Sequence, residues 1–212
     1  MRLLDLFCCE GGAAKGYADA GFEVVGVDKD PQPRYPFRFI QGDALERLGE
    51  TAAGFDAIHA SPPCQGYSKA QRIQRRDHER LIAATRDALR ATGLPYVIEN
   101  VMDARDELHD PVMLCGTMFG LRLYRHRLFE TNWPLTAPLH GQHYLRQVKM
   151  GRSPGPQDIL QPVGNFAGVA EAREAMDMPW ASRDGLREAI PPAYAEYVGG
   201  QLAAHVAMGR AA

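Results

Sequence analysis

Apolar runs and amphipathic stretches alternate through the first hundred residues of the chain. Five short apolar runs, bounded by Gly, Pro or acidic residues, predict strands at residues 3–7, 22–28, 38–43, 55–60 and 94–98. Periodic stretches predict helices at residues 13–20, 77–91 and 193–208, the second with a basic outer face. Because strands alternate with helices, the pattern predicts an α/β protein with one doubly wound sheet.

The pattern is less regular after residue 100. Residues 124–130 predict a strand in which Arg125 and Arg127 project to the same side. Residues 132–168 hold many Pro, Gly, His and Gln residues, which predict loops or short strands. We therefore divide the chain into a core at residues 1–131, a loop-rich region at 132–188, and a closing segment at 189–212 whose helix packs back on the core.

A cysteine follows the fourth predicted strand, in the stretch Ser61-Pro62-Pro63-Cys64-Gln65-Gly66-Tyr67-Ser68. The two prolines cannot extend a strand ladder, so the backbone leaves the sheet in a stiff shape. A thiol placed there lies at the carboxyl edge of the sheet, where parallel sheets bind ligands. The fifth strand runs directly into Glu99, which brings a carboxylate to the same edge. A buried structural cysteine is the alternative for Cys64 taken alone.

A glycine turn links the first strand to the first helix. Gly11 and Gly12 allow the backbone to approach a ligand beneath the helix N-terminus, although such a turn by itself is weak support. Asp28 ends the second strand, where an acid can accept hydrogen bonds from ribose hydroxyls. Asp43 follows the third strand, where it either contacts an adenine amine or serves as a helix N-cap.

Composition is that of an ordinary soluble globular protein: 212 residues, 45% hydrophobic and 24% charged, with a formal net charge of −2. No run of about 18 apolar residues appears, so we expect no membrane span. The first residues lack a signal-peptide layout, and we expect a cytoplasmic location. The four cysteines form no C-x-x-C pair, so we expect neither a metal site nor a disulfide.

Positive charge is concentrated in two segments, residues 69–90 and 122–152. Such segments on a nearly neutral chain are typical of a face that binds a polyanion, with solvated helix faces and loops as the alternative. The first segment begins directly after the Cys64 loop. Residues expected to contact a nucleic-acid substrate there are Gln65, Ser68, Lys69, Arg72, Arg75 and Arg76.

Four motifs, in order, resemble those of the DNA (cytosine-5) methyltransferases of bacteria and phages, including those of restriction–modification systems. The matches cover roughly residues 1–131 and are Asp5-Leu6-Phe7 with Gly11-Gly12, Pro62-Pro63-Cys64-Gln65, Glu99-Asn100-Val101, and Arg125-His126-Arg127. The resemblance implies a class I S-adenosylmethionine-dependent methyltransferase fold: a Rossmann-like mixed α/β sheet with helices on both faces. It also implies S-adenosylmethionine as cofactor and DNA, duplex with a flipped cytosine or single-stranded, as partner.

The resemblance implies a role for each matched residue. Cys64 would add to carbon 6 of cytosine, which makes carbon 5 reactive. Glu99 would protonate or hydrogen-bond N3, Arg125 would steady O2, and Arg127 completes the catalytic set. The cofactor pocket would be lined by Phe7, Cys9, Gly11, Gly12, Asp28, Lys29, Asp43, Ala44 and Pro63.

The chain departs from the family pattern in several places. Cys9, with Glu10 next to it, replaces the family's first glycine after the first strand. Leu123 replaces the Gln before the two arginines, and Glu188-Ala189-Ile190 stands where the family has a Gly-Asn segment. About sixty residues separate Arg127 from Pro191, which is too few for the family's target-recognition domain. Residues 132–188 would be a reduced version of it, so selectivity would be weak or supplied by a specificity partner.

Three alternatives stay open from the sequence. The same residues could act on RNA or a free nucleotide, or install another one-carbon group. The chain could be a non-catalytic nucleic-acid-binding protein, although such a protein needs no thiol at this edge. A Rossmann dehydrogenase is disfavoured because the G-x-G-x-x-G spacing is missing.

Overall fold

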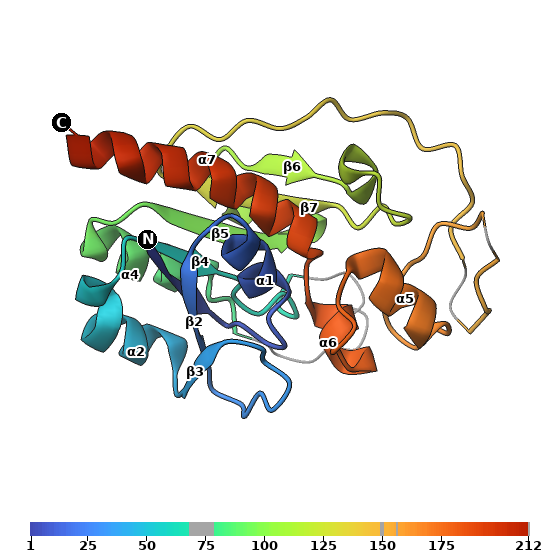
Figure 1. Ribbon diagram of the computed structural model, residues 1–212, viewed down its shortest axis with the longest axis horizontal. Helices are drawn as coiled ribbons and strands as arrows, with labels where there is room; N and C mark the ends of the chain where they lie inside the picture. The colour runs from blue at the N-terminus through green and yellow to red at the C-terminus, as the bar shows by residue number, and fades with distance from the viewer. Residues whose placement is uncertain (68–78, 149–150, 156, 212) are drawn as a thin grey trace.

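The computed structural model describes residues 1–67, 79–148, 151–155 and 157–211. Its centre is a seven-stranded sheet with the order β3-β2-β1-β4-β5-β7-β6 (Figure 1). Strands β1 to β5 pair in parallel, and β7 runs antiparallel between β5 and β6. The strands are β1 Arg2–Leu6, β2 Glu23–Asp28, β3 Arg38–Gln41, β4 Ala57–Ala60, β5 Tyr96–Val101, β6 Val112–Leu114 and β7 Arg127–Thr131.

Helices cover both faces of this sheet. Helices α1 (Gly12–Asp19) and α7 (Pro192–Ala211) pack on one face against a core that includes Leu3. Helices α2 (Ala44–Thr51) and α4 (Ile82–Thr92) pack on the other against a core that includes Leu4. Successive residues of a strand point to opposite faces, so one apolar run contributes side chains to both cores. The predicted two-faced α/β sheet is confirmed.

The two helices on the α1 face approach each other closely. A Cβ on Gly16 would lie 2.0 Å from the Pro192 carbonyl oxygen, so only glycine allows α7 to begin on α1. Pro191 precedes the helix and Pro192 is its first residue, where a backbone N–H would have no helical partner in any case. This contact fixes the C-terminal helix across the sheet, next to the first glycine turn.

The predicted elements of the core are present, with shifted ends. Strand β4 starts at Ala57 and α4 starts at Ile82, both later than the sequence indicated. Helix α2 was not predicted as an element; Asp43 caps its N-terminus. The strand expected at residues 124–130 is wrong at its start, because β7 begins only at Arg127. Short 3-10 helices occupy Ala52–Gly54, Met102–Glu107 and Gly116–Phe119.

The region from residue 132 to 188 combines a long connection with a small helical unit. Helices α5 (Val169–Met176) and α6 (Arg183–Glu188) share an apolar cluster with Leu123 and Leu160. Before them, the connection at the top of Figure 1 runs along the outside of α7. It is held there by hydrogen bonds between Thr136 and the Gln201 side chain.

Within the described residues, none of the helices combines the length and apolar character that crossing a membrane requires.

Candidate active site

Cys64 and Glu99 come from neighbouring parallel strands. Strand β4 pairs with β5 in parallel register, and Cys64 lies four positions beyond the end of β4. The Asn100 side chain donates a hydrogen bond of 2.8 Å to the Pro62 carbonyl, which ties the cysteine loop to β5. Carboxyl ends of adjacent parallel strands meet at one edge, so the thiol and the carboxylate are brought together as the sequence indicated.

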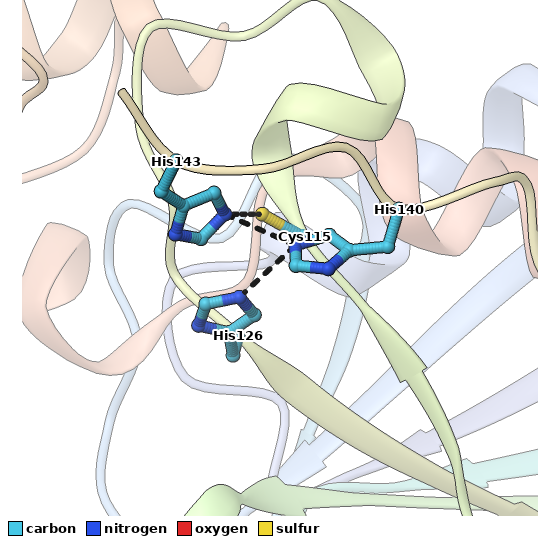
Figure 2. A group of neighbouring side chains, drawn as sticks. All are labelled: Cys115, His126, His140 and His143. Atoms are coloured by element: carbon cyan, nitrogen blue, oxygen red, sulfur yellow. Dashed lines mark hydrogen bonds between the residues drawn. The ribbon is translucent and has the colours of Figure 1, made fainter. Parts of the chain in front are cut away.

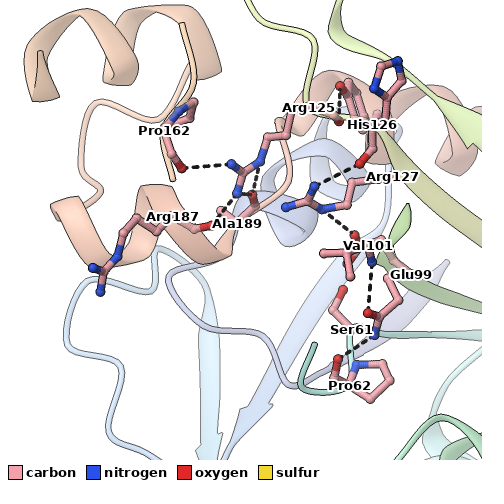
Figure 3. Close-up of polar contacts among 12 residues, drawn as sticks. Ser61, Pro62, Glu99, Val101, Arg125, His126, Arg127, Pro162, Arg187 and Ala189 are labelled. Atoms are coloured by element: carbon pink, nitrogen blue, oxygen red, sulfur yellow. Dashed lines mark hydrogen bonds and ion pairs between the residues drawn. The ribbon is translucent and has the colours of Figure 1, made fainter. Parts of the chain in front are cut away.

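Arg127 is the partner of Glu99. Its Nε lies 3.0 Å from Glu99 Oε1, and the two side chains are only 13% and 7% exposed (Figure 3). Antiparallel pairing of β7 with β5 sets Arg127 opposite Val101 and so places it at the end of the strand that carries Glu99. A shielded ion pair of this kind keeps the carboxylate in a fixed position.

Burial raises the pKa of Glu99, while Arg127, a Ser61 hydrogen bond and Arg125 oppose this effect. Burial also raises the pKa of the Cys64 thiol, and Glu99 adds to this, although Arg127 and Arg125 pull it down. The lowered pKa that a nucleophilic cysteine needs is therefore not present in the free protein. Both groups are shifted toward their protonated forms.

A buried chain of polar groups leads from the core to Glu99. Tyr17 Oη lies 3.0 Å from His59 Nδ1, His59 Nε2 lies 2.9 Å from Ser61 Oγ, and Ser61 hydrogen-bonds the Glu99 carboxyl. Burial lowers the pKa of His59 to about 3, so its ring is neutral. With Glu99 accepting from Ser61, His59 must donate to Ser61 and accept from Tyr17. Sequence reasoning missed these residues, since His59 lies within an apolar strand.

Arg125 does not lie beside Arg127 on one strand face, which corrects the sequence-based prediction. It precedes β7 with a φ of +34°, and this turn points its side chain away from the sheet. Its guanidinium is buried and donates to the carbonyls of Pro162, Arg187 and Ala189 (Figure 3). The side chain therefore holds residues 162 and 187–189 against the carboxyl edge of the sheet, and four of its N–H donors face protein carbonyls.

The turn after β1 contains three residues with positive φ. Phe7, Cys9 and Gly11 have φ values of 59°, 44° and 83°, which non-glycine residues rarely adopt. The carboxylate of Asp28 accepts hydrogen bonds from the backbone N–H groups of Cys9 and Asp30, both 3.0 Å long. These bonds fix Asp28 at the end of β2 and leave further lone pairs on both oxygens.

The remaining expected cofactor residues are placed in different ways. Gly12 is required by packing, because a Cβ there would lie 2.4 Å from the Ile190 carbonyl oxygen. Asp43 is the N-cap of α2 and accepts from Leu45 and Glu46, which was one of its two predicted roles. The Ala44 side chain is buried in the core, Pro63 is half-buried and Lys29 is exposed.

Two acids near this turn were not assigned by the sequence. Glu188 hydrogen-bonds the Cys9 thiol, and burial followed by the charge of Glu188 raises the pKa of Cys9. Glu10 accepts from the Ser182 N–H and hydroxyl, both at 2.6 Å, and so joins the turn to the start of α6. Cys9, Glu10 and Glu188 are all positions where the chain departs from the family pattern. Cys9 and Glu188 contact each other, and Glu10 contacts the residue that precedes α6.

The expected substrate-side residues are only partly described. Gln65 lies half-buried in the turn after Cys64, whereas Ser68, Lys69, Arg72, Arg75 and Arg76 lie outside the described residues. The basic face predicted for α4 needs correction at Arg86, which is buried and paired with Glu130 at 2.6 and 2.7 Å. The Arg86 guanidinium therefore lies in the interior and not on the outer face, because this position of the helix points toward Glu130 of β7.

The fold and the site define a class of protein. A prophage-encoded E. coli protein described as a DNA modification methyltransferase superposes with a TM-score of 0.67 at 16% identity, covering 96% of this chain and 99% of that one. The S. pombe Dnmt2 methyltransferase gives 0.62 at 13% identity, covering 97% and 99%. The seven-stranded mixed sheet is that of the class I S-adenosylmethionine-dependent methyltransferases, as predicted.

Sequence comparison narrows this class to a family. Residues 1–110, more than half of the chain, match the family model of C-5 cytosine-specific DNA methylases. The chain belongs to this family. It is 30% identical to type II methyltransferase M.AgeI of Thalassovita gelatinovora over 37% of its length, and 32% identical to M.FnuDI of Fusobacterium nucleatum over 33%. Each match covers only 22% of the relative's own length.

Proposed function

We propose that this protein transfers a methyl group from S-adenosylmethionine to carbon 5 of cytosine in DNA. The observation that carries the proposal is the grouping of Cys64 with the Glu99–Arg127 ion pair at one edge of the sheet. A thiol, a shielded carboxyl and a guanidinium are the groups that nucleophilic addition to a cytosine ring needs. The family membership of residues 1–110 supports the same reaction.

The residues at the β1 turn fit S-adenosylmethionine. Asp28 offers oxygen lone pairs at the end of β2, which suit the hydroxyls of a ribose. Glu188 acts on Cys9, so a second carboxylate lies near the turn and suits the positive charge at the methionine end of the cofactor. When bound, the cofactor supplies an electrophilic methyl group.

Cys64 is the proposed nucleophile. Its sulfur forms a bond to carbon 6 of the base, and the electron pair of the 5,6 double bond becomes available at carbon 5. After transfer, carbon 5 loses its proton and the bond to Cys64 breaks, which restores the ring. Because the pKa of Cys64 is raised in the free protein, the thiol must lose its proton as the substrate binds.

Glu99 and Arg127 act on the charge that develops on the base. A carboxyl with a raised pKa can donate its proton toward N3 as sulfur adds. Arg127 holds Glu99 in place and contributes positive charge beside the base. We assign this second task to Arg127 because the Arg125 donors are used by three backbone carbonyls.

We propose that the base enters through an open cavity beside Arg127; Cys64 and Glu99 are not among the residues that line it. It is lined by residues 101–103, 124–127, 147 and 160–163. A cytosine within a stacked duplex cannot reach such a site, so the base is flipped out or already single-stranded. The helices α5 and α6 occupy the region where larger relatives would carry a recognition domain, so sequence preference is expected to be short or supplied by a partner.

A methyl-transfer assay tests this function. Purified protein is incubated with methyl-labelled S-adenosylmethionine and duplex DNA, single-stranded DNA, tRNA or dCMP. We expect label in DNA, at carbon 5 of cytosine by mass spectrometry, and none when every cytosine is replaced by 5-methylcytosine. Label confined to tRNA or dCMP would show that the substrate assignment is wrong.

A trapping experiment tests the nucleophile. DNA that carries 5-fluorocytosine should form a stable adduct, because fluorine cannot leave carbon 5 as a proton does. Peptide mapping should place this adduct on Cys64, and Cys64→Ser should abolish both adduct and transfer while the protein keeps its fold and cofactor affinity. Normal turnover by Cys64→Ser would contradict the mechanism.

A further inference from the structure

Four potential metal ligands converge at the border of the cavity beside Arg127, which His126 also lines. The Sγ of Cys115 lies 3.3 Å from His143 Nε2, which lies 3.0 Å from His140 Nε2, which in turn lies 3.4 Å from His126 Nε2 (Figure 2). All four atoms lie within 4.8 Å of one another. The residues come from the segment before the 3-10 helix at Gly116–Phe119, from the turn before β7, and from the long connection after β7.

The spacing of these atoms matches a tetrahedral site. Zinc binds imidazole nitrogen at about 2.0–2.1 Å and thiolate sulfur at about 2.3 Å, which puts neighbouring nitrogens about 3.4 Å apart and nitrogen and sulfur about 3.6 Å apart. The observed separations of 3.0, 3.3 and 3.4 Å are close to these values. The other three separations are at most 4.8 Å, so small rotations of the side chains would bring all four atoms to one centre.

Hydrogen bonding alone does not account for this arrangement. A neutral imidazole nitrogen has one in-plane position, occupied either by a hydrogen or by a lone pair. His140 Nε2 faces two other ring nitrogens, and His143 Nε2 faces a ring nitrogen and a sulfur. One position cannot bond in two directions at once. A cation at the centre would accept one lone pair from each of the four atoms.

We propose that Cys115, His126, His140 and His143 form a structural Zn²⁺ site. One thiolate and three imidazoles are ligands that zinc prefers, and tetrahedral sulfur–nitrogen geometry is typical of it. Four protein ligands leave no open position for a substrate, which separates this site from catalytic zinc centres. The ion would take no chemical part in methyl transfer, but its ligand His126 also lines the cavity beside Arg127.

Neighbouring groups hold the ligands in orientation. The Tyr124 ring stacks on His143, with centroids 3.6 Å apart and planes 3° from parallel. The Tyr124 hydroxyl donates to the Leu145 carbonyl and accepts from the Leu145 N–H, so the chain after His143 is fixed as well. Thr117 Oγ1 lies 3.2 Å from Cys115 Sγ. Contacts that orient metal ligands in this way are typical of established sites.

The metal would fasten the connection after β7 to the catalytic edge. The connection is tied to the rest of the chain by hydrogen bonds between Thr136 and Gln201 and by the isolated bridge between Gln147 and Ile159, and the two histidines lie between these points. His140 and His143 are exposed, and Leu139 and Tyr144 beside them are 98% and 83% exposed, so burial does little to hold this segment. His126 stands between Arg125 and Arg127, so the proposed ion ties this segment to the residues that form the active site.

The cysteine pattern had argued against a metal site, because no C-x-x-C pair occurs. The proposed ligand set has only one cysteine, and the first and last ligands are 28 positions apart. Only the His140-x-x-His143 pair is local in sequence. The grouping depends on β6 and β7 lying side by side and on the connection folding back over them.

Metal analysis of the full chain tests the proposal. The protein is freed of metal with a chelator, then titrated with Zn²⁺ or Co²⁺ alone. We expect about one equivalent of zinc retained after desalting. We expect cobalt to give the intense visible bands of a tetrahedral ion, together with a thiolate-to-metal charge-transfer band. Cys115→Ser should abolish the charge-transfer band, and His143→Ala should abolish zinc retention.

Matched controls separate metal binding from loss of fold. Cys64→Ser removes a different thiol and should leave the cobalt spectrum unchanged. His109→Ala removes an exposed histidine outside the cluster and should leave zinc retention unchanged. Circular dichroism of each variant checks that it is folded. A folded wild-type protein that retains no zinc and gives no tetrahedral cobalt spectrum would overturn the proposal, as would an unchanged charge-transfer band in Cys115→Ser.

Discussion

Arg127 Nε lies 3.0 Å from Glu99 Oε1, and neither side chain is more than 13% exposed. This ion pair acts on the cysteine as well, because the charge of Arg127 is the strongest influence that lowers the pKa of Cys64. One guanidinium thus modulates both groups that must exchange protons during the reaction. Replacing Arg127 tests this coupling.

Arg127→Ala should raise the pKa of Cys64 above its already raised value. Alkylation by iodoacetamide requires the thiolate, so its rate rises with pH through the thiol pKa, and the midpoint should move to higher pH in the variant. Peptide mass spectrometry of Cys64 as a function of pH measures this. Arg127→Lys keeps the charge and should shift the midpoint less. An unchanged midpoint in Arg127→Ala would show that the two groups are not coupled.

Glu99→Gln should lower the methyl-transfer rate by about 10²- to 10⁴-fold, since the amide cannot deliver a proton. The raised pKa of Glu99 keeps its protonated form present at higher pH than for an ordinary glutamate, and activity should fall as pH rises through that pKa. This limb of the pH–rate profile should vanish in the variant. Calorimetry should show unchanged cofactor affinity. A collapse of cofactor affinity with a normal rate at saturation would assign Glu99 to the cofactor pocket instead.

Ser61→Ala should move the same pH limb upward. The Ser61 hydrogen bond lowers the pKa of Glu99, so its removal favours the protonated carboxyl and extends activity to higher pH. Ser182→Ala removes a hydroxyl that caps α6 and should cost about 1 kcal/mol of stability without moving the limb. Identical pH profiles for wild type and Ser61→Ala would mean that the buried Tyr17–His59–Ser61 chain does not act on Glu99.

Arg125→Ala should chiefly destabilise the fold. Its guanidinium donates to three backbone carbonyls, and hydrogen bonds from charged donors contribute about 1.5–3 kcal/mol each, so we expect a loss of more than about 3 kcal/mol in urea unfolding. Arg125→Lys should not restore it, since one ammonium cannot span the three acceptors. Unchanged stability with a collapsed rate would instead support direct contact of Arg125 with the cytosine O2.

Arg86→Ala should cost about 3–5 kcal/mol, because it leaves the buried Glu130 carboxylate without its partner. Arg90→Ala, on the same helix but exposed, should change stability by less than about 0.5 kcal/mol. Thermal or urea unfolding of the two variants makes the comparison. Equal stability of both variants would show that the Arg86–Glu130 pair does not stabilise the fold, as expected if Arg86 belonged to the solvated basic face.

The sequence by itself determined the frame of the protein and the approximate positions of its parallel strands. Apolar runs interrupted by Gly and Pro located β1, β2, β4 and β5, because a strand buried on both faces requires continuous apolar residues. From the strand ends followed the positions of Cys64 and Glu99. A parallel sheet presents all its carboxyl ends at one edge, so no knowledge of long-range contacts was needed to bring these two residues together.

Only the tertiary structure decided which partner each charged group finds. Arg86 pairs with Glu130 across 44 positions, and Glu10 accepts from Ser182 across 172. The two arginines of the R-x-R motif looked equivalent, yet one is paired with Glu99 and the other is held by backbone carbonyls. Periodicity reports the local backbone and its buried face, whereas charge pairing and the Cys115–histidine cluster depend on which segments the fold brings side by side.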